Sequence, residues 1–175
     1  LQRVERGQER LDRLIPVHSA DLISNSPISE TFVDKPGASV AQLCEASIIW
    51  SDNTAANLLL ATIGGPAGLT QFIRGLEDAY TRLDRNEPKL GECIPGDPRD
   101  TTTPAAMLGT LRRLLLSVDS PLSQKPRAQL TAWLVDNRTG DTRLRAGLPK
   151  TWTVGDKTGA GGHGSNNDVA IVWPP

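Results

Sequence analysis

Three short groups of polar residues carry the side chains that could do chemistry: Ser51–Asn53, Glu87 and Lys157–Gly159. A serine hydroxyl beside a lysine ammonium can relay a proton, and a glutamate can act as a general base toward water. Each group also has an ordinary interpretation, because serine, aspartate and asparagine cap helices, while a loop glutamate or a lysine at a strand end is usually solvated. Only their combination therefore favours a catalytic site.

These groups need elements to position them, and helical periodicity predicts most of those elements. Ser39 and Gln42 form a capping-box pattern, Gly64–Pro66 stops one helix and opens the next, and Thr103 caps a helix that starts at Pro104. The expected helices are residues 39–48, 54–62, 68–76, 105–116 and 123–135, and the expected strands are 152–157 and 168–173. The chain therefore reads as many helices followed by two strands.

Glu87 lies in a segment without sustained periodicity, Arg82–Thr103. Its prolines are Pro88, Pro95 and Pro98, and its glycines are Gly91 and Gly96. This composition predicts a long irregular loop, and loops of this length in a compact domain are usually functional or disordered.

The composition excludes several classes of partner. The 175 residues hold 19 Lys+Arg and 20 Asp+Glu, with acids and bases interleaved, so no basic face is expected for nucleic acid. No apolar run approaches the roughly 20 residues of a membrane span. The two cysteines and two histidines form no local metal motif. We therefore expect no nucleic acid, membrane, metal or cofactor.

The order of an S-D-N triplet, a loop glutamate and a K-T-G triplet resembles the signature of class A serine β-lactamases. Residues 51–60 read SDNTAANLLL and residues 100–104 read DTTTP, and the resemblance covers essentially the whole chain. It implies an α/β (α+β) fold, with mostly the helical subdomain of a serine β-lactamase/transpeptidase-like fold plus two antiparallel strands of its sheet. The implied divisions of the partial catalytic domain 1–175 are a helical region at about 1–140, the Glu87 loop at 82–103 and the start of the sheet region at about 141–175.

The resemblance also implies a role for each polar group. Ser51 relays a proton to the departing ring nitrogen, Lys157 holds this relay in a positive field, and Glu87 activates the water that cleaves the acyl-enzyme. The implied substrate-binding residues are Asn53 for the side-chain amide, Thr158 and Gly159 along the strand, the N–H of Ala160 in the oxyanion hole, and Arg143 for the carboxylate.

The nucleophile of that family is missing, because no serine in the chain has a lysine three residues later. We expect this S-x-x-K element on an upstream helix of which Leu1–Glu5 is the tail, so that the chain alone is inactive. Gly91 stands where many members carry an asparagine that positions the hydrolytic water, and Asn25 stands where an aromatic residue often walls the cleft.

The full-length protein is expected to hydrolyse penicillins and cephalosporins, confer antibiotic resistance, and act as a secreted or periplasmic monomer with a small-molecule β-lactam as its partner. The alternative is a penicillin-binding sensor or D,D-peptidase relative that is acylated but turns over slowly. Glu87 favours the hydrolase and Gly91 favours the alternative. A helical interaction module without catalysis would leave the order of the three polar groups unexplained.

The loop must have fixed ends if it is to hold an essential acid. We predict an Arg85–Asp100 ion pair at its neck, since a partly buried arginine–carboxylate pair is a strong local anchor. The resemblance implies a cis peptide bond between Glu87 and Pro88. The side chains predicted to converge on one cleft are Ser51, Asn53, Glu87, Lys157 and Thr158.

The absence of the nucleophile's helix carries an expectation about packing. The helices over 39–62 should lose their main partner, leaving an exposed apolar patch near Ile48, Ile49 and Leu58–Leu60. Each buried Leu or Ile left exposed forfeits roughly 1.5 to 3 kcal/mol, against a domain stability of about 5 to 15 kcal/mol. The chain by itself is therefore expected to be unstable or prone to aggregation.

Overall fold

The computed structural model describes every residue from Leu1 to Pro175. It combines helices with two small antiparallel sheets. The helices are α1 (Gln2–Glu5), α2 (Val40–Ile49), α3 (Asn53–Ala61), α4 (Gly65–Arg74), α5 (Pro104–Leu115) and α6 (Gln124–Val135). The strands are β1 (Leu14–Ile15), β2 (Ala38–Ser39), β3 (Thr153–Ala160) and β4 (Asn166–Trp173), and the short 3-10 turns include η3 (Lys89–Gly91) and η4 (Leu144–Gly147).

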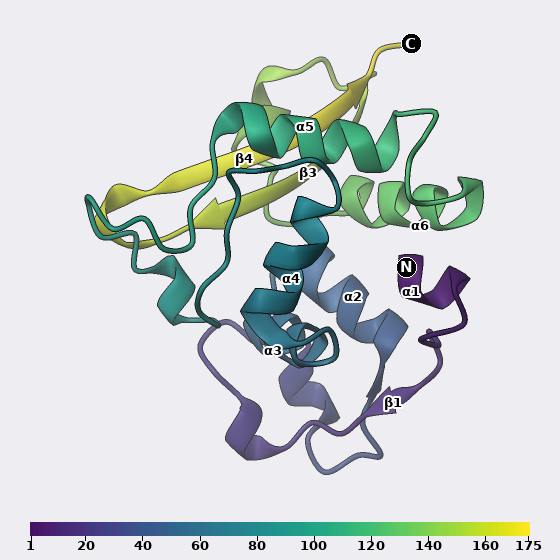
Figure 1. Cartoon of the computed structure of the whole chain (residues 1–175), viewed down its shortest axis with the longest axis vertical. Helices are drawn as coiled ribbons and strands as arrows, with labels where there is room; N and C mark the ends of the chain where they lie inside the picture. Colours follow the sequence, from purple (N-terminus) through teal and green to yellow (C-terminus); the bar gives the residue numbers. More distant parts are fainter.

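The helices lie in two groups. Figure 1 shows α2, α3 and α4 together in the middle of the molecule, above the β1 region, while α5 lies across the β3–β4 pair with α6 beside it. β3 and β4 pair along their whole length, from Thr153 opposite Trp173 to Ala160 opposite Asn166. The chain thus ends in a hairpin that lies against the second helical group.

Local capping explains where the main helices begin. The Ser39 side chain accepts a hydrogen bond from the Gln42 amide, and the Gln42 side chain accepts one from the Ser39 amide, which is the predicted capping box. Thr103 caps α5 through the Ala106 amide, as predicted. Gly64 adopts the left-handed conformation, with φ of 91°, before α4. These signals are local, so the sequence alone revealed them.

Some elements differ from the sequence prediction. The third helix was predicted at 68–76, but α4 begins at Gly65 because Pro66 fits its first turn. The strands extend to the glycine turn, over 153–160 and 166–173. The two-residue strands β1 and β2 pair antiparallel and were not predicted, because two residues carry no alternation.

Two apolar clusters hold the fold together. The larger cluster surrounds the buried face of α2, where Leu43 is fully buried beside Val40 and Ala46. The smaller cluster joins Leu115 of α5, Leu134 of α6 and Ile171 of β4. The second cluster therefore fixes the hairpin to the helices that cover it.

The loop over residues 82–103 is closed at its neck by a network around Asp100. Arg85 Nε lies 2.6 Å from Asp100 Oδ2, and the Asp100 side chain is only 2% exposed. Asp100 also accepts hydrogen bonds from the amides of Asp84 and Arg85. This is the ion pair that the sequence predicts, and the Glu87–Pro88 peptide bond is cis, as the resemblance implies.

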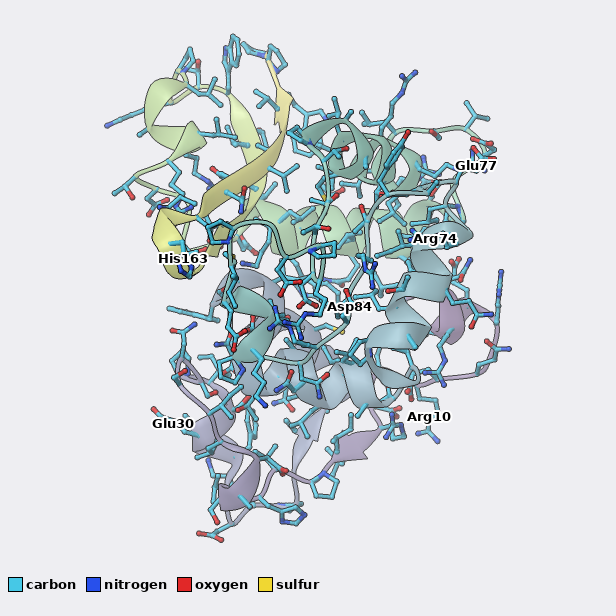
Figure 2. All side chains as sticks on the ribbon, turned by 60° about the vertical axis from the view of Figure 1, so that its left-hand side comes forward. Arg10, Glu30, Arg74, Glu77, Asp84 and His163 are labelled. Atoms are coloured by element: carbon cyan, nitrogen blue, oxygen red, sulfur yellow. The ribbon has the colours of Figure 1, made fainter.

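The far end of this loop rests on the β3–β4 hairpin. A side chain at Gly161 would meet Cys93 Sγ at 2.6 Å and the Gly91 carbonyl oxygen at 2.7 Å. The Nδ1 atom of His163 lies 3.1 Å from the Glu92 carbonyl oxygen. Figure 2 shows His163 at the tip of the hairpin and Asp84, at the loop neck, in the middle of the view. The loop is therefore held at its neck by the Asp100 network and at its tip by the hairpin.

The predicted exposed apolar patch is wrong, because Ile49 and Leu60 are only 7% and 8% exposed. Ile48 packs instead against the cluster formed by α5, α6 and β4. The apolar side chains of α2, α3 and α4 surround a cavity of about 1050 Å³, whose lining also includes Leu1–Val4 and Glu87. This cavity is partly open to solvent, so the apolar residues on this side line a pocket and do not form a bare patch.

The network at the loop neck leads to a testable expectation. Replacing Asp100 with Ala removes the acceptor of the Asp84 and Arg85 amides, so these amides should exchange with solvent about tenfold faster. The matched control is Asp97→Ala, which removes a pair confined to Asp97 and Arg99 on the same loop. Hydrogen exchange measures both variants, and unchanged protection in Asp100→Ala would contradict the anchoring role.

Candidate active site

The lysine of the K-T-G triplet touches the serine of the S-D-N triplet. Lys157 Nζ, from β3, donates a hydrogen bond of 2.9 Å to Ser51 Oγ in the turn between α2 and α3, and another of 2.8 Å to the Thr158 carbonyl oxygen. The two residues are 106 positions apart in sequence. The fold therefore unites the two triplets, as predicted, across the boundary between the first helical group and the hairpin.

Burial changes the proton affinity of the lysine in this contact. It lowers the pKa of Lys157, and the nearby carboxylates of Asp156 and Asp168 oppose the shift because they favour the charged ammonium. The Ser51 oxygen accepts from the ammonium, so the hydroxyl proton stays available for donation to another group. The pair can thus act as a proton donor backed by a positive charge.

Asp52, in the middle of the first triplet, has a structural role. Its fully buried carboxylate caps α3 by accepting from the Ala55 amide and also accepts from the amides of Ile28 and Ser29 and from the Ser29 hydroxyl. The capping interpretation is therefore right for Asp52. It leaves the side chains of Ser51 and Asn53 on either side free for other contacts.

The backbone around Ser51 is held in an uncommon conformation. Ser51 has φ of 56°, in the left-handed region that residues other than glycine rarely adopt. Asn25 Nδ2 donates to the Ser51 carbonyl oxygen at 2.7 Å, and the Asn53 amide donates to the Asn25 carbonyl oxygen at 2.9 Å. Asn53 Nδ2 donates to the Ser24 carbonyl oxygen at 3.0 Å. The segment around Asn25 thus forms a rim that braces the backbone of Ser51 and the side chain of Asn53.

Glu87 lies half-buried in the loop, and α3 fixes its backbone. Asn57 Nδ2 donates to the Glu87 carbonyl oxygen, and the Glu87 amide donates to Asn57 Oδ1, each at 3.0 Å. Burial raises the pKa of Glu87, while the ammonium of Lys157 opposes the shift. Glu87 is therefore a carboxylate of enhanced basicity within electrostatic reach of the Lys157–Ser51 pair.

Asn57, which lies one helical turn after Asn53, is a site residue that the sequence did not predict. The spacing of the two asparagines on α3 was the available signal, because residues four apart share a helix face. Thr139 was not predicted either; its hydroxyl lies 2.6 Å from that of Thr158 and donates to Asn137 Oδ1. No local pattern marks Thr139, since its partner is on a strand 19 residues away.

Arg143 reaches the end of β3 from the segment that follows α6. Its Nη1 atom donates to the Gly159 carbonyl oxygen at 2.9 Å and to the Asn167 carbonyl oxygen at 2.7 Å. Its Nη2 atom lies 3.3 Å from Asn166 Oδ1. Gly159 and Ala160 form the last residues of β3, so the guanidinium sits where the strand meets its turn.

The fold brings Ser51 and Lys157 into contact and places the Glu87 carboxylate within the electrostatic field of the Lys157 ammonium. Thr158, Gly159 and Ala160 follow Lys157 on the same strand, and Asn53 follows Ser51 at the start of α3. No group of three or more His, Cys, Asp or Glu side chains has the geometry of a metal site. None of the helices is long and apolar enough to cross a membrane.

Comparison with known proteins matches this chain to a family. The model of the beta-lactamase enzyme family matches residues 1–175. Beta-lactamase L2 of Stenotrophomonas maltophilia is 50% identical over 174 residues, covering 99% of this chain and 56% of that protein. Beta-lactamase FAR-1 of Nocardia farcinica is 53% identical over 162 residues, covering 93% of this chain and 51% of that protein. The chain thus spans about half the length of these curated relatives.

A solved structure agrees with the sequence relatives. An ancestral class A β-lactamase of Gram-negative bacteria superposes with a TM-score of 0.96 at 61% identity, covering 99% of this chain and 66% of that chain. Its mixed fold of helices and antiparallel strands is the class that the sequence predicts. The family model matches every residue of the chain, and the S-D-N and K-T-G triplets are in contact. The chain therefore belongs to the class A β-lactamases of the beta-lactamase enzyme family.

Proposed function

We propose that the protein carrying this chain opens the β-lactam ring of penicillins and cephalosporins through a serine acyl-enzyme. The observation that carries the proposal is the 2.9 Å contact between Lys157 Nζ and Ser51 Oγ, with the half-buried carboxylate of Glu87 in the field of the same lysine. In this proposal the chain supplies the proton relay, the deacylating base and the substrate-binding strand of a partial catalytic domain.

Acylation requires a proton for the ring nitrogen as it departs. Ser51 donates this proton, because its oxygen accepts from Lys157 and its hydroxyl hydrogen is therefore free to be donated to another group. The Lys157 ammonium stabilises the negative charge that develops on the serine oxygen during the transfer. The brace from Asn25 keeps Ser51 in its left-handed conformation while this happens.

Deacylation requires a base that removes a proton from water. Glu87 has this role, because burial raises the pKa of its carboxyl group and makes the ionised form a stronger base. The Asn57 amide fixes the loop at Glu87 from α3, and the ion pair at the neck fixes it from Asp100. The carboxylate therefore keeps a constant position relative to the site.

The substrate lies along β3, whose edge away from β4 has no strand partner in this chain. An extended ligand can bond to the backbone groups of such an edge. We assign the substrate contacts to Asn53 for the side-chain amide, Thr158 and Gly159 along the strand, Ala160 N–H in the oxyanion hole, and Arg143 for the carboxylate.

The nucleophile comes from an S-x-x-K segment that this chain does not contain. We propose that this segment occupies the cavity of about 1050 Å³ between α2, α3 and α4. Asn57 and Glu87 line that cavity, so a helix placed there would present its serine next to the base. We propose that the full-length protein, with this segment in place, is a secreted or periplasmic monomer that confers antibiotic resistance and needs no cofactor.

A second candidate is a penicillin-binding sensor or D,D-peptidase relative that is acylated but releases the drug slowly. Gly91 favours this candidate because it places no side chain beside the hydrolytic water. A nitrocefin assay on the full-length gene product separates the two: the hydrolase turns over continuously, whereas the sensor gives one stoichiometric burst. No acylation at all would overturn both.

Glu87→Gln keeps the shape of the side chain and removes the base. We expect acylation to continue and deacylation to slow by about 10² to 10⁴, the usual contribution of a general base. The full-length variant should then give a burst of one equivalent and stall, with the acyl-enzyme visible by mass spectrometry. Glu45→Gln, an exposed acid on α2, is the control that should turn over like the parent. Normal steady turnover by Glu87→Gln would refute its role as base.

The shifted pKa values predict the pH profiles of kcat and kcat/KM in the full-length protein. Glu87 must be ionised for deacylation, and burial raises its pKa, so kcat, which includes deacylation, should fall on the acidic side at a pH above the 4.5 of an ordinary glutamate. Lys157 must be charged for acylation, and burial lowers its pKa, so the alkaline fall of kcat/KM should lie below the ordinary 10.5.

Lys157→Arg tests the second assignment, because arginine stays charged above pH 12. Whatever activity this variant keeps should lose the alkaline fall and retain the acidic one. An alkaline fall at the same pH in both proteins would show that another group causes it.

A further inference from the structure

The segment between α6 and β3 is fixed to the hairpin through three consecutive residues. Arg143 donates from its side chain to the carbonyl oxygens of Gly159 and Asn167. Leu144 donates from its amide to Asp168 Oδ2 at 3.0 Å. Arg145 forms a partly buried ion pair with Asp156 on β3. Arg143 and Arg145 make their contacts through their side chains. Leu144, between them, makes its contact through its backbone amide, which donates to a carboxylate on β4.

Asp168 resembles Asp52, and differs from Asp100 and Asp156, in that no arginine or lysine pairs with it directly. Asp100 and Asp156 each have an arginine partner, at 2.6 and 2.5 Å. Asp168 Oδ2 accepts the Leu144 amide, whereas Asp168 Oδ1 is buried without any hydrogen-bond partner. The specific interaction of this carboxylate is therefore with the backbone of the segment that carries Arg143.

The charges around Asp168 explain why its ionised form is tolerated without a direct pair. Burial raises its pKa and Asp156 adds to that shift, while the guanidinium groups of Arg143 and Arg145 oppose it. The Lys157 ammonium, on β3, also lies within its field. Burial is the largest of these effects, and the hydrogen bond from the Leu144 amide is the next largest and favours the ionised carboxylate.

The contact gives a partner within the protein to a backbone group that would otherwise bond only to water. Leu144 is the first residue of η4, whose cap Arg143 makes no side-chain capping bond. The first amides of any helical turn lack partners inside the turn and need an outside acceptor. Asp168 supplies that acceptor from β4, one peptide unit away from Arg143.

Arg143 retains donors for a ligand once it is held in this way. Both Nη1 protons are used by the two carbonyl oxygens, and Nη2 has one long contact with Asn166. Arginine carries five N–H donors, so the Nε proton and one Nη2 proton remain. A carboxylate can take two such parallel bonds. The remaining face of Arg143 therefore fits an anionic group at the end of β3.

We propose that Asp168 is a positioning residue for Arg143: by holding the Leu144 amide, it keeps the guanidinium aimed at the substrate carboxylate. The proposal rests on the proposed function and adds to it a residue that acts through the backbone without touching the substrate. Asp168 lies opposite Thr158 in the strand register, so the anchor and the substrate-binding strand form one unit.

The test compares Asp168→Ala with Asp168→Asn in the full-length protein. Asparagine keeps an oxygen that accepts the Leu144 amide, whereas alanine removes it. We expect KM to rise about fivefold to tenfold in Asp168→Ala with kcat changed less than about twofold, as for one lost hydrogen bond that acts on binding. Asp168→Asn should restore KM to within about twofold of the parent value.

A double variant checks that the effect passes through Arg143. Once Arg143→Ala has removed the guanidinium, adding Asp168→Ala should raise KM no further, because the two changes remove the same interaction. An additive rise would overturn the proposal. So would an Asp168→Asn variant that behaves like Asp168→Ala, or an Asp168→Ala variant with unchanged KM.

Hydrogen exchange gives a readout that does not depend on turnover. The Leu144 amide should be protected in the parent and in Asp168→Asn, and should exchange about tenfold faster in Asp168→Ala. If the parent fails to hydrolyse any β-lactam, the proposed function fails while exchange at Leu144 still decides whether Asp168 anchors the segment. Equal exchange in all three proteins would refute the anchor.

Discussion

The buried carboxylate of Asp52 is the constraint on which the site depends. A charged group removed from water is stable only when it is compensated, and here four donors from two segments converge on it. Satisfying Asp52 fixes the start of α3 and brings Ile28 and Ser29 against it. The turn at Ser51 and the rim at Asn25 then have little freedom, because both are attached to segments that Asp52 has already fixed.

The second half of the site is built on a different principle. β3 obtains its position from packing against α6 and from the apolar cluster shared by Leu115, Leu134 and Ile171. The Arg138 amide donates to the Ile49 carbonyl oxygen at 2.9 Å, which ties this half to the end of α2. The contact between Lys157 and Ser51 therefore joins two bodies that are each ordered by other means, and neither depends on that contact for its own shape.

Sequence patterns predicted what is local. The capping box at Ser39, the cap at Thr103 and the glycines before α4 depend on residues a few positions apart, and each formed as expected. The ion pair of Arg85 with Asp100 was also predictable, because a loop rich in proline needs a closed neck. The contact of Lys157 with Ser51 came from family resemblance, since no local rule links residues 106 positions apart.

Packing between distant elements was not predictable from the sequence. The expectation of an exposed patch around Ile48 and Ile49 was wrong because α5, α6 and β4 cover that face of α2. Asp168 read as part of a strand, and its partner Leu144 lies in a segment with no periodicity. Such partners are chosen by strand register and helix packing, which a single sequence does not display.

Gly140 shows how the structure limits the evolutionary paths open to this chain. A methyl group there would collide with the carboxylate of Asp156, which is held by Arg145 and Asn137. Gly109 on α5 has nothing within 4 Å of where its methyl group would lie. A substitution to alanine can therefore be accepted at position 109 without moving a neighbour. At position 140 the same substitution requires the Asp156 network to change with it.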